Sequence, residues 1–473
     1  MKILEAVSNP IFNNVAEVAD QINQETYVVG GFVRDYLLNR GQKKDIDFVT
    51  VGNGILLAKE LSIKLGNTSQ VSVFKRFGTA MFKYEQTELE FVGARKESYS
   101  EDSRKPHVED GTLEDDQKRR DFTINTLAIS MNKENFGELI DPFNGVEDLN
   151  NKIIKTPLEP NVTYSDDPLR MMRAIRFAAQ LHFEIEKDSF QAIIDNADRI
   201  NIVSFERVMD EFQKIMMTDK PSVGLLLLEQ SGLLQHILPE LVALKGIEEV
   251  EGQKHKDNFY HTLEVVDNIS ENTDNVWLRW AALLHDIGKA VTKRFDKKVG
   301  WTFHSHEFVG SKMTVKLFRR LKLPLGNQMK YVQKLVMMSS RPIAVVTDDA
   351  TDSALRRLLF DAGEDFDDLI TLCKADITTK NEKKQRRFKQ NFEVVEQKIK
   401  DVEERDHVRN FQPPISGEQI MEIFDIQPGK EIGILKNAIK EAILEGEVEN
   451  NYNSALEFVI NRGKDLNLEP KNI

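Results

Sequence analysis

The hydrophobic pattern changes once along this 473-residue chain, and the change limits the folds that the chain can adopt. Residues 1 to about 150 alternate short β-rich runs with stretches of helical periodicity. From about Asp166 onward nearly every segment has helical periodicity, broken at glycines and prolines. We therefore expect an α/β N-terminal domain followed by all-α domains in a multidomain, elongated chain. The expected strands are Thr26–Val29, Ile46–Val51, Val71–Phe74, Ala80–Tyr84 and Leu89–Val92.

The length also predicts several domains, because single cores rarely grow beyond about 250–300 residues. We expect an α/β domain over 1–150, a helical domain over 151–250, a histidine-containing helical domain over 251–385 and a helical tail over 386–473. Phe392–Val402 is expected in a long charged helix, and residues 415–433 are expected to form a helix, a Pro-Gly turn and a second helix.

The formal charge of −13 disfavours a protein that binds nucleic acid by bulk attraction. It leaves room for a narrow positive groove, because basic residues cluster at Lys118–Arg120, Arg170–Arg176 and Lys383–Lys389. The longest apolar runs are far shorter than the roughly 20 residues that cross a bilayer. The start of the chain lacks a secretory pattern, and the single Cys373 cannot form an internal disulfide. We expect a cytoplasmic protein with no membrane partner.

A glycine pair and an acidic pair are the most distinctive local features. Gly30 and Gly31 stand between an expected strand and helix, where backbone N–H groups can approach a triphosphate because glycine has no Cβ. Arg34 lies one turn into that helix and can add positive charge. Asp45 and Asp47 are two apart on the next strand, so their carboxylates share a face. Such a pair beside phosphates suits Mg²⁺, and two ions can activate a hydroxyl and stabilise leaving pyrophosphate.

At these elements the chain resembles the class II tRNA nucleotidyltransferase and poly(A) polymerase family of the DNA polymerase β superfamily, over about residues 25–215. The resemblance implies a nucleotidyltransferase palm in which Asp45 and Asp47 hold the magnesium ions. It implies that the glycine turn and Arg34 contact the incoming nucleotide. Glu90, on the expected strand Leu89–Val92, is the candidate third catalytic carboxylate.

A second motif, Arg119-Arg-Asp-Phe-Thr-Ile-Asn125, is expected to open a helix with Asp121 as its cap. The motif matches the family's Arg-Arg-Asp-Phe-Thr-x-Asn pattern. The resemblance implies that Arg120 and Asp121 help to hold the triphosphate and sugar, and that they favour ribonucleotides.

A third motif begins another helix, with Pro168 in its first turn and with Asp167 and Arg170 three apart on one face. A fixed carboxylate can accept from the exocyclic amino group of cytosine or adenine, while a guanidinium donates to the ring nitrogen. Guanine and uracil present the opposite order on that edge. The resemblance implies that Asp167 and Arg170 read the base, with Arg173 and Arg176 as supporting nucleotide contacts; Asp166 stands where the family more usually has Glu.

Five of the nine histidines fall between His255 and His306, which indicates a metal site. The order His…His-Asp…Asp resembles the HD superfamily of metal-dependent phosphohydrolases. The resemblance implies that a divalent transition metal can be bound, and that His304 and His306 could serve a second ion or a substrate phosphate. The implied ligands are His261, His285, Asp286 and Asp376.

These motifs together predict template-independent addition or repair of the 3′-terminal CCA of tRNA from CTP and ATP, with release of pyrophosphate and possible phosphohydrolase activity of the HD domain. The expected partners are tRNA, ATP and CTP, without DNA. Poly(A) polymerase remains an alternative, since Phe74–Thr79 partly resembles its basic signature. A partial, A-adding or CC-adding enzyme is a further alternative. An HD hydrolase with a vestigial N-terminal site is disfavoured by the intact Asp45 and Asp47, and a pure RNA-binding module by the acidic composition.

Overall fold

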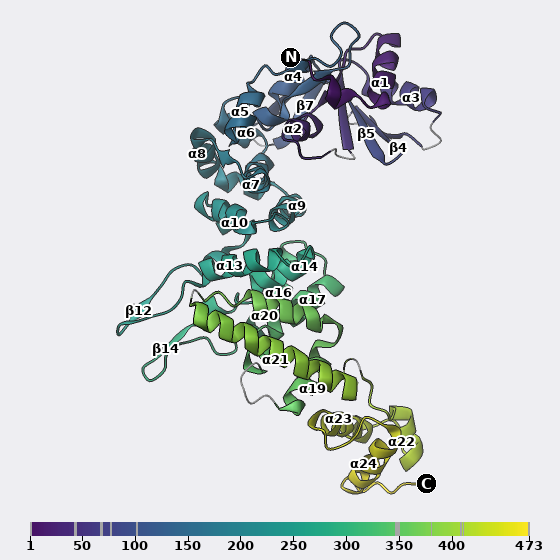
Figure 1. Ribbon diagram of the computed structural model, residues 1–473, viewed down its shortest axis with the longest axis vertical. Coiled ribbons are helices and arrows are strands. Elements are labelled where there is room, and N and C mark those ends of the chain that lie inside the picture. The colour runs from purple at the N-terminus through teal and green to yellow at the C-terminus, as the bar shows by residue number, and fades with distance from the viewer. Residues whose placement is uncertain are drawn as a thin grey trace. The chain divides into compact units, whose positions relative to one another are not determined.

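The computed structural model in Figure 1 describes residues 2–41, 45–66, 70–75, 78–100, 103–345, 351–379, 381–406, 409 and 411–471. The side chains of residues 98–100, 103–107 and 389 lie outside this description, as do Arg76 and Phe77 of the expected Phe74–Thr79 signature. The chain divides into two compact units, Met1–Pro239 and Glu240–Ile473. The short helix α12, Pro239–Val242, contains the boundary between them.

A seven-stranded mixed sheet organises the first unit, with strand order β3-β4-β5-β2-β1-β8-β9. β2 and β5 run parallel, whereas the other neighbours in this sheet are antiparallel. The five expected strands are confirmed, with ends that shift by one or two residues. The sheet strands are β1 Thr26–Val29, β2 Asp45–Thr50, β3 Ser72–Phe74, β4 Thr79–Tyr84, β5 Thr87–Gly93, β8 Ala128–Ser130 and β9 Leu139–Ile140.

Buried apolar residues alternate with more exposed residues along the strands, and this gives the sheet one apolar face. Phe48, Phe82 and Phe91 point to this face, where Phe91 stacks on Phe48 and on Phe82 with ring centroids 4.9 and 5.8 Å apart. Helices α1, Pro10–Gln21, and α3, Gly54–Lys64, belong to this side of the unit, since α3 packs on β4 and β5 and α1 packs on α3. The acidic residues of β2 and β5 lie on the opposite face of the sheet from this buried apolar face.

Helices complete the first unit after the sheet. α7 packs against α9 and α10, and a parallel pair of short strands ties β10, Ile153–Ile154, to β11, Glu184–Ile185. A hairpin of β6, Arg95–Ser100, and β7, Ser103–Asp110, follows β5. The remaining helices are α2 Gly31–Leu37, α4 Leu113–Lys118, α5 Gly145–Asn151, α6 Pro160–Asp166, α7 Leu169–Leu181, α8 Lys187–Asp195, α9 Phe205–Met216, α10 Pro221–Gln230 and α11 Leu233–Ile237.

The second unit is mainly helical around a core that includes Trp280 and Phe318, whose rings are 6.2 Å apart. α13 packs on α14, and α14 packs on α17. The expected long charged helix is α21, and the expected helix-turn-helix is α22 and α23. The helices are α13 Asn258–Ser270, α14 Val276–Leu284, α15 Lys289–Thr292, α16 His306–Arg320, α17 Asn327–Met338, α18 Arg341–Val345, α19 Asp352–Ala362, α20 Phe366–Ala375, α21 Glu382–Asp406, α22 Gly417–Phe424, α23 Lys430–Glu445 and α24 Tyr452–Lys464.

Two local expectations are wrong. The segment after Arg119 forms only a 3₁₀ turn, Thr123–Asn125, because the Asp121 carboxylate accepts from the Phe122 N–H and the chain then enters β8. The region expected to be purely helical contains β11 and two hairpins, too short for their periodicity to register. The hairpin strands are β12 Glu249–Val250, β13 Gln253–Lys254, β14 Arg294–Asp296 and β15 Gly300–Thr302.

No helix in the part of the chain that the structure describes combines the length and the apolar character needed to cross a membrane.

Candidate active site and metal centre

Four carboxylates share the face of the sheet opposite the phenylalanines. Asp45 lies beside Glu88 and Asp47 beside Glu90 in the parallel register of β2 and β5. Since side chains of facing residues in adjacent strands point the same way, the expected pair and the candidate third carboxylate lie on one face. Asp45 and Glu88 are exposed, and Asp47 and Glu90 are half-buried.

The electrostatics of Glu90 reflect this crowding. Burial, together with the negative charges of Asp47 and Glu88, raises the pKa of the Glu90 carboxyl, while Arg95 acts in the opposite direction. Like charges that raise a carboxyl pKa are relieved by a cation. The oxygen-only donor set of Asp45, Asp47 and Glu90 therefore fits Mg²⁺.

The turn at Gly30 adopts a backbone conformation that favours glycine. Its φ is +70°, and its N–H donates to the carbonyl oxygen of Leu127 at 3.1 Å. A Cβ at this position would lie 3.1 Å from Nη1 of Arg120. Gly31 is the first residue of α2, so its N–H lies at a helix N-terminus that can bind phosphate. The turn and Arg120 are therefore neighbours, as a shared triphosphate site requires.

Arg34 lies beneath this turn and is only 3 % exposed. Its Nε donates to Asp35 at 2.8 Å, its Nη1 donates to Oδ1 of Asn125 at 2.7 Å, and its guanidinium lies 4.9 Å from the centroid of Phe177. The guanidinium thus orders Asn125 and connects α2 to α7.

Asp121 is the centre of a buried charge network. Its Oδ1 accepts from the Asn125 amide at 2.9 Å, and its Oδ2 accepts from Nε of Arg173 at 2.7 Å. Although burial favours the neutral form, the charge of Arg173 and the Asn125 hydrogen bond lower the pKa of Asp121 to about 2. The residue is therefore a fixed anion at neutral pH that positions Arg173.

A polar hollow of about 560 Å³ collects most of the expected nucleotide-binding residues. It contains both Asp167 and Arg170, the expected base readers, and Arg95, whose charge also acts on Glu90. Arg95 comes two residues after β5, the strand that carries Glu90, so one side of the hollow lies close along the chain to the carboxylate face. Its lining residues are Arg95, Arg119, Arg120, Asp121, Asp167, Leu169, Arg170, Arg173, Arg207, Asp210, Glu211 and Lys214.

The expected base-reading pair, Asp167 and Arg170, is held by backbone contacts. Asp167 precedes α7, and its Oδ1 accepts from the Leu169 N–H at 3.3 Å. Nη2 of Arg170 donates to the carbonyl oxygen of Arg119 at 2.7 Å, which ties the third motif to the second. Arg176 faces elsewhere: it pairs with Glu211 at 2.5 Å and lies over Phe177, outside the hollow lining.

Sequence reasoning missed Asp116, a fully buried carboxylate that pairs with both Arg119 and Arg120. These arginines lower its pKa against the effect of burial. The spacing of Asp116 to Arg119 and Arg120, three and four residues, was a usable signal for such contacts. Arg95, Arg207 and Lys214 carried no local signal, because only the tertiary fold brings them to the hollow.

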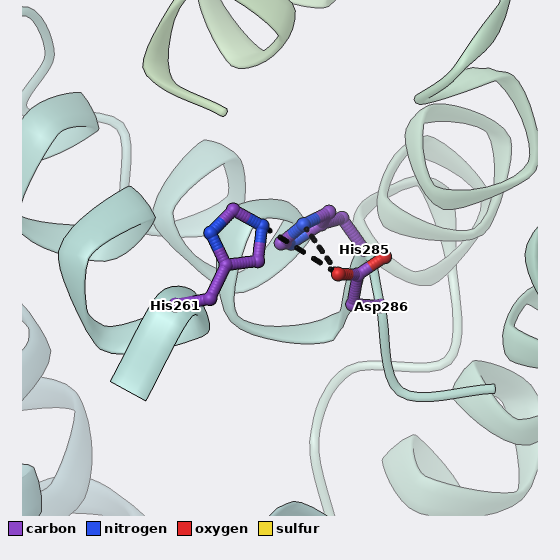
Figure 2. Close-up of side chains that lie close together, drawn as sticks. All are labelled: His261, His285 and Asp286. Atoms are coloured by element: carbon purple, nitrogen blue, oxygen red, sulfur yellow. Dashed lines mark ion pairs between the residues drawn. The ribbon is translucent and has the colours of Figure 1, made fainter. Parts of the chain in front are cut away.

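In the second unit, His261, His285 and Asp286 form a buried cluster whose ligand atoms all lie within 4.8 Å of one another (Figure 2). Asp286 Oδ2 lies 3.6 Å from Nε2 of His261 and 3.3 Å from Nε2 of His285. Asp376, at the end of α20, places Oδ1 2.8 Å from Nε2 of His261 and 3.5 Å from Nε2 of His285. All four expected ligands therefore meet.

The histidine nitrogens are arranged as in a metal site. Nδ1 of His285 lies 2.7 Å from the Ala282 carbonyl oxygen, while its buried Nε2 has no partner among the described residues beyond the Asp286 and Asp376 carboxylates. Although burial favours the neutral ring, Asp286 and Asp376 raise the pKa of His285 to about 10. The two carboxylates thus favour positive charge at this position, and a divalent transition metal that takes the place of the proton on His285 would fit the nitrogen and oxygen donors of the cluster.

His306 and His304 differ in their placement. Nε2 of His306 lies 3.4 Å from Oδ1 of Asp286, so this ring extends the cluster. His304 is exposed and makes no hydrogen bond or ion pair with another residue that the structure describes. Of the two histidines, only His306 adjoins the expected ligands.

Two lysines near the cluster were also missed. Nζ of Lys289 lies 2.6 Å from Asp286 Oδ2, and Nζ of Lys256 lies 2.8 Å from Nδ1 of His261 and 2.5 Å from Oγ1 of Thr378. Lys289 was visible three residues after Asp286 in the sequence, whereas Lys256 and Thr378 are brought together only by folding.

Family models match three parts of the chain. The Poly A polymerase head domain matches residues 26–155, the probable RNA and SrmB-binding site of polymerase A matches 182–244, and the HD domain matches 258–362. The fold and the site thus define a nucleotidyltransferase enzyme that carries an HD domain.

Two relatives identify the family more specifically than the family models do. The chain is 33 % identical over 347 residues to an A-adding tRNA nucleotidyltransferase of Deinococcus radiodurans, covering 71 % of this chain and 76 % of that one. It is 32 % identical over 370 residues to a multifunctional CCA protein of Vibrio parahaemolyticus, covering 74 % and 85 %. The chain belongs to the tRNA nucleotidyltransferase family.

A solved structure shares the fold. The Bacillus stearothermophilus CCA-adding enzyme in complex with CTP superposes with a TM-score of 0.67 at 21 % identity, covering 96 % of this chain and 97 % of that chain.

Proposed function

We propose that this enzyme adds nucleotides to the 3′ end of tRNA, using CTP and ATP to build or repair the terminal CCA. One observation supports this most directly: the face bearing Asp45, Asp47 and Glu90 and the hollow that contains Asp167 and Arg170 belong to one unit, and Arg95, two residues after the strand of Glu90, lines that hollow. A metal-binding face and a base-reading hollow in one unit are the two parts that template-independent addition needs.

In this proposal Asp45 and Asp47 would hold Mg²⁺ ions, whose chemistry there would be to lower the pKa of the attacking 3′-hydroxyl and to offset charge on pyrophosphate. Glu90 lies beside Asp47 as a third anionic group. The Gly30 turn and Arg120 bind the triphosphate of the incoming nucleotide. Asp121 orients Arg173 toward the nucleotide, since both line the hollow. The protein forms no covalent bond to the substrate, so positioning and charge stabilisation carry the reaction.

Base selection is proposed to reside in Asp167 and Arg170, with Arg173 as a supporting contact. The Asp167 carboxylate accepts from the amino group of cytosine or adenine, and the Arg170 guanidinium donates to the ring nitrogen. The backbone contacts of both residues fix their separation. Arg176 supports them indirectly, because its contacts with Glu211 and Phe177 brace α7.

Charge-neutral substitutions in the acidic pair test the polymerising role. With tRNA lacking its last three nucleotides, Asp45→Asn and Asp47→Asn should each lower the rate of labelled CTP incorporation by at least about 1000-fold. Glu60→Gln, an exposed carboxylate on α3, is the control and should retain the wild-type rate. Incorporation that survives in both Asp variants would refute the proposal.

A second candidate is addition of the terminal A alone, which the Deinococcus relative's name favours. The same assay separates the two, because an A-adding enzyme uses only tRNA that already ends in CC.

The HD cluster is proposed to hydrolyse phosphate esters at RNA ends, which its buried His285 Nε2 and paired carboxylates favour. Hydrolysis of an RNA 2′,3′-cyclic phosphate with added divalent transition metal tests this activity. The reaction should be lost in a His285→Ala, Asp286→Ala double variant; equal rates in both proteins would exclude it.

A further inference from the structure

The first two turns of α21 form an exposed basic segment, defined here as residues 382–388 (α21 is labelled in Figure 1). Every side chain in this segment is exposed, and Phe392 is the first buried residue among the described side chains of the helix. The rest of α21 anchors the segment to the second unit through its buried residues Val395, Ile399 and Val402.

The charges of the basic segment have no compensation within the described protein. It contains Lys383, Lys384, Arg386 and Arg387 against Glu382 alone. None of the four cations makes an ion pair or side-chain hydrogen bond with another described residue. Like charges three and four residues apart repel, and positive charge in a first turn opposes the helix dipole. This arrangement weakens the helix end in isolation, and a polyanion would reverse the effect.

A hollow of about 430 Å³ lies at the base of the basic segment. Arg386 and Gln385 line it from α21, Lys374 lines it from α20, and Ile377 lines it from the segment that follows α20. Ile377 directly follows Asp376, one of the four clustered carboxylate and imidazole residues, so the hollow adjoins the metal centre along the chain. Lys374 is already paired with Glu396 at 2.7 Å, which leaves Arg386 as the lining cation without such a partner.

We infer that the basic segment binds the phosphodiester backbone of an RNA chain beside the HD cluster. The choice of RNA as the polyanion rests on the proposed function, whereas the anion-binding character rests on the charges alone. A membrane surface fits poorly, because an amphipathic membrane helix needs a broad apolar face and this segment has only Phe388. A protein of net charge −13 can bind RNA only through such local concentrations of positive charge.

Two matched double variants of the full chain test the inference. Arg386→Gln with Arg387→Gln removes two cations from the basic segment, and Lys398→Gln with Lys400→Gln removes two exposed cations from later in the same helix. Binding of unmodified tRNA is measured by fluorescence anisotropy over about 50–200 mM salt. The arginine variant should reduce the slope of log affinity against log salt by about 1.5 and weaken binding at least about fivefold. The lysine variant should bind like the wild type, and circular dichroism checks that both variants keep the helical content of the wild type.

The possible results separate this inference from the proposed function. If wild-type protein binds tRNA and the two variants bind equally well, the inference is overturned and the proposed function stands. If wild-type protein does not bind tRNA, both are overturned. Binding to phosphatidylserine vesicles that depends on Arg386 and Arg387, without an effect of these residues on tRNA, would also overturn it.

Discussion

At the scale of single residues, Asp121 shows how one side chain can organise a site. It contacts Asn125 within its own motif and Arg173 from α7, and Asn125 in turn accepts from Arg34 of α2. Hydrogen bonds thus connect Asp121 to α7 directly and to α2 through Asn125. The motif around residue 119 marked these residues as important, but only the fold shows that Asp121 acts through its partners.

Asp121→Asn should destabilise the first unit. The substitution keeps the shape but leaves Arg173 without its buried anionic partner, which lowers the free energy of unfolding by about 2 kcal/mol at neutral pH. Urea unfolding measures this loss. A variant as stable as the wild type would show that the pair contributes nothing.

The same residue gives the stability a defined pH dependence. The pKa of Asp121 is about 2 in the folded state, below its usual value near 3.9, so its contribution is complete above about pH 4 and falls as the pH drops toward 2. The stability difference between wild type and Asp121→Asn should therefore shrink by about half between pH 5 and pH 3. A difference independent of pH would contradict the assigned ion pair.

Gly30→Ala should impair nucleotide binding more than its backbone strain alone explains. Gly30 and Gly41 both have positive φ, +70° and +63°, so alanine is strained at each, and at Gly30 the ψ of −127° makes the conformation one that residues with a Cβ rarely adopt. Only at Gly30 would the new Cβ meet Arg120, since no described atom lies within 4 Å of it at Gly41. We expect a raised KM for CTP in Gly30→Ala and an unchanged KM in Gly41→Ala; equal KM values would separate the turn from the triphosphate.

At the scale of elements, the parallel register of β2 and β5 determines the carboxylate face. Period-two spacing made the shared face of Asp45 and Asp47 predictable, because it depends only on strand geometry. The neighbouring position of Glu90 was only a candidate, because strand order is a tertiary property. The helix expected after Arg119 failed because the Asp121 carboxylate, expected to cap it, instead holds a short turn that leads into a strand.

The expected HD ligands gather within the second unit, so metal binding there should be separable from the chemistry of the first unit. His285→Ala removes a buried donor nitrogen from the cluster, so metal analysis after dialysis against Mn²⁺ should show about one ion per chain in the wild type and little in the variant. His236→Ala, at a histidine paired with Asp198 in the first unit, is the control. Equal metal content in both variants would show that His285 is not a metal ligand.

At the scale of the whole molecule, the two compact units carry the two sites separately. The order of motifs along the chain predicts this division, because the nucleotidyltransferase motifs all precede Pro239 and the HD motif follows it. It could not reveal Arg207 in the hollow or Lys256 at the metal cluster, because neither lies in a recognisable motif and both reach their sites only in the folded units.

Calorimetry should register this separation. A divalent transition metal should raise the unfolding temperature of the second unit, and CTP with Mg²⁺ should raise that of the first unit. Each shift should be a few degrees at a ligand concentration about 100 times the dissociation constant. A single transition shifted equally by both ligands would show that the units unfold together.

The central claim concerns what is added to which end, and sequencing of reaction products tests it most directly. Wild-type protein is incubated with all four nucleoside triphosphates and with tRNA that lacks one, two or three 3′ nucleotides. We predict that all three substrates end in CCA and that extension then stops. Products that end in long A tracts, in G or U, or at the original nucleotide in every substrate would contradict the account.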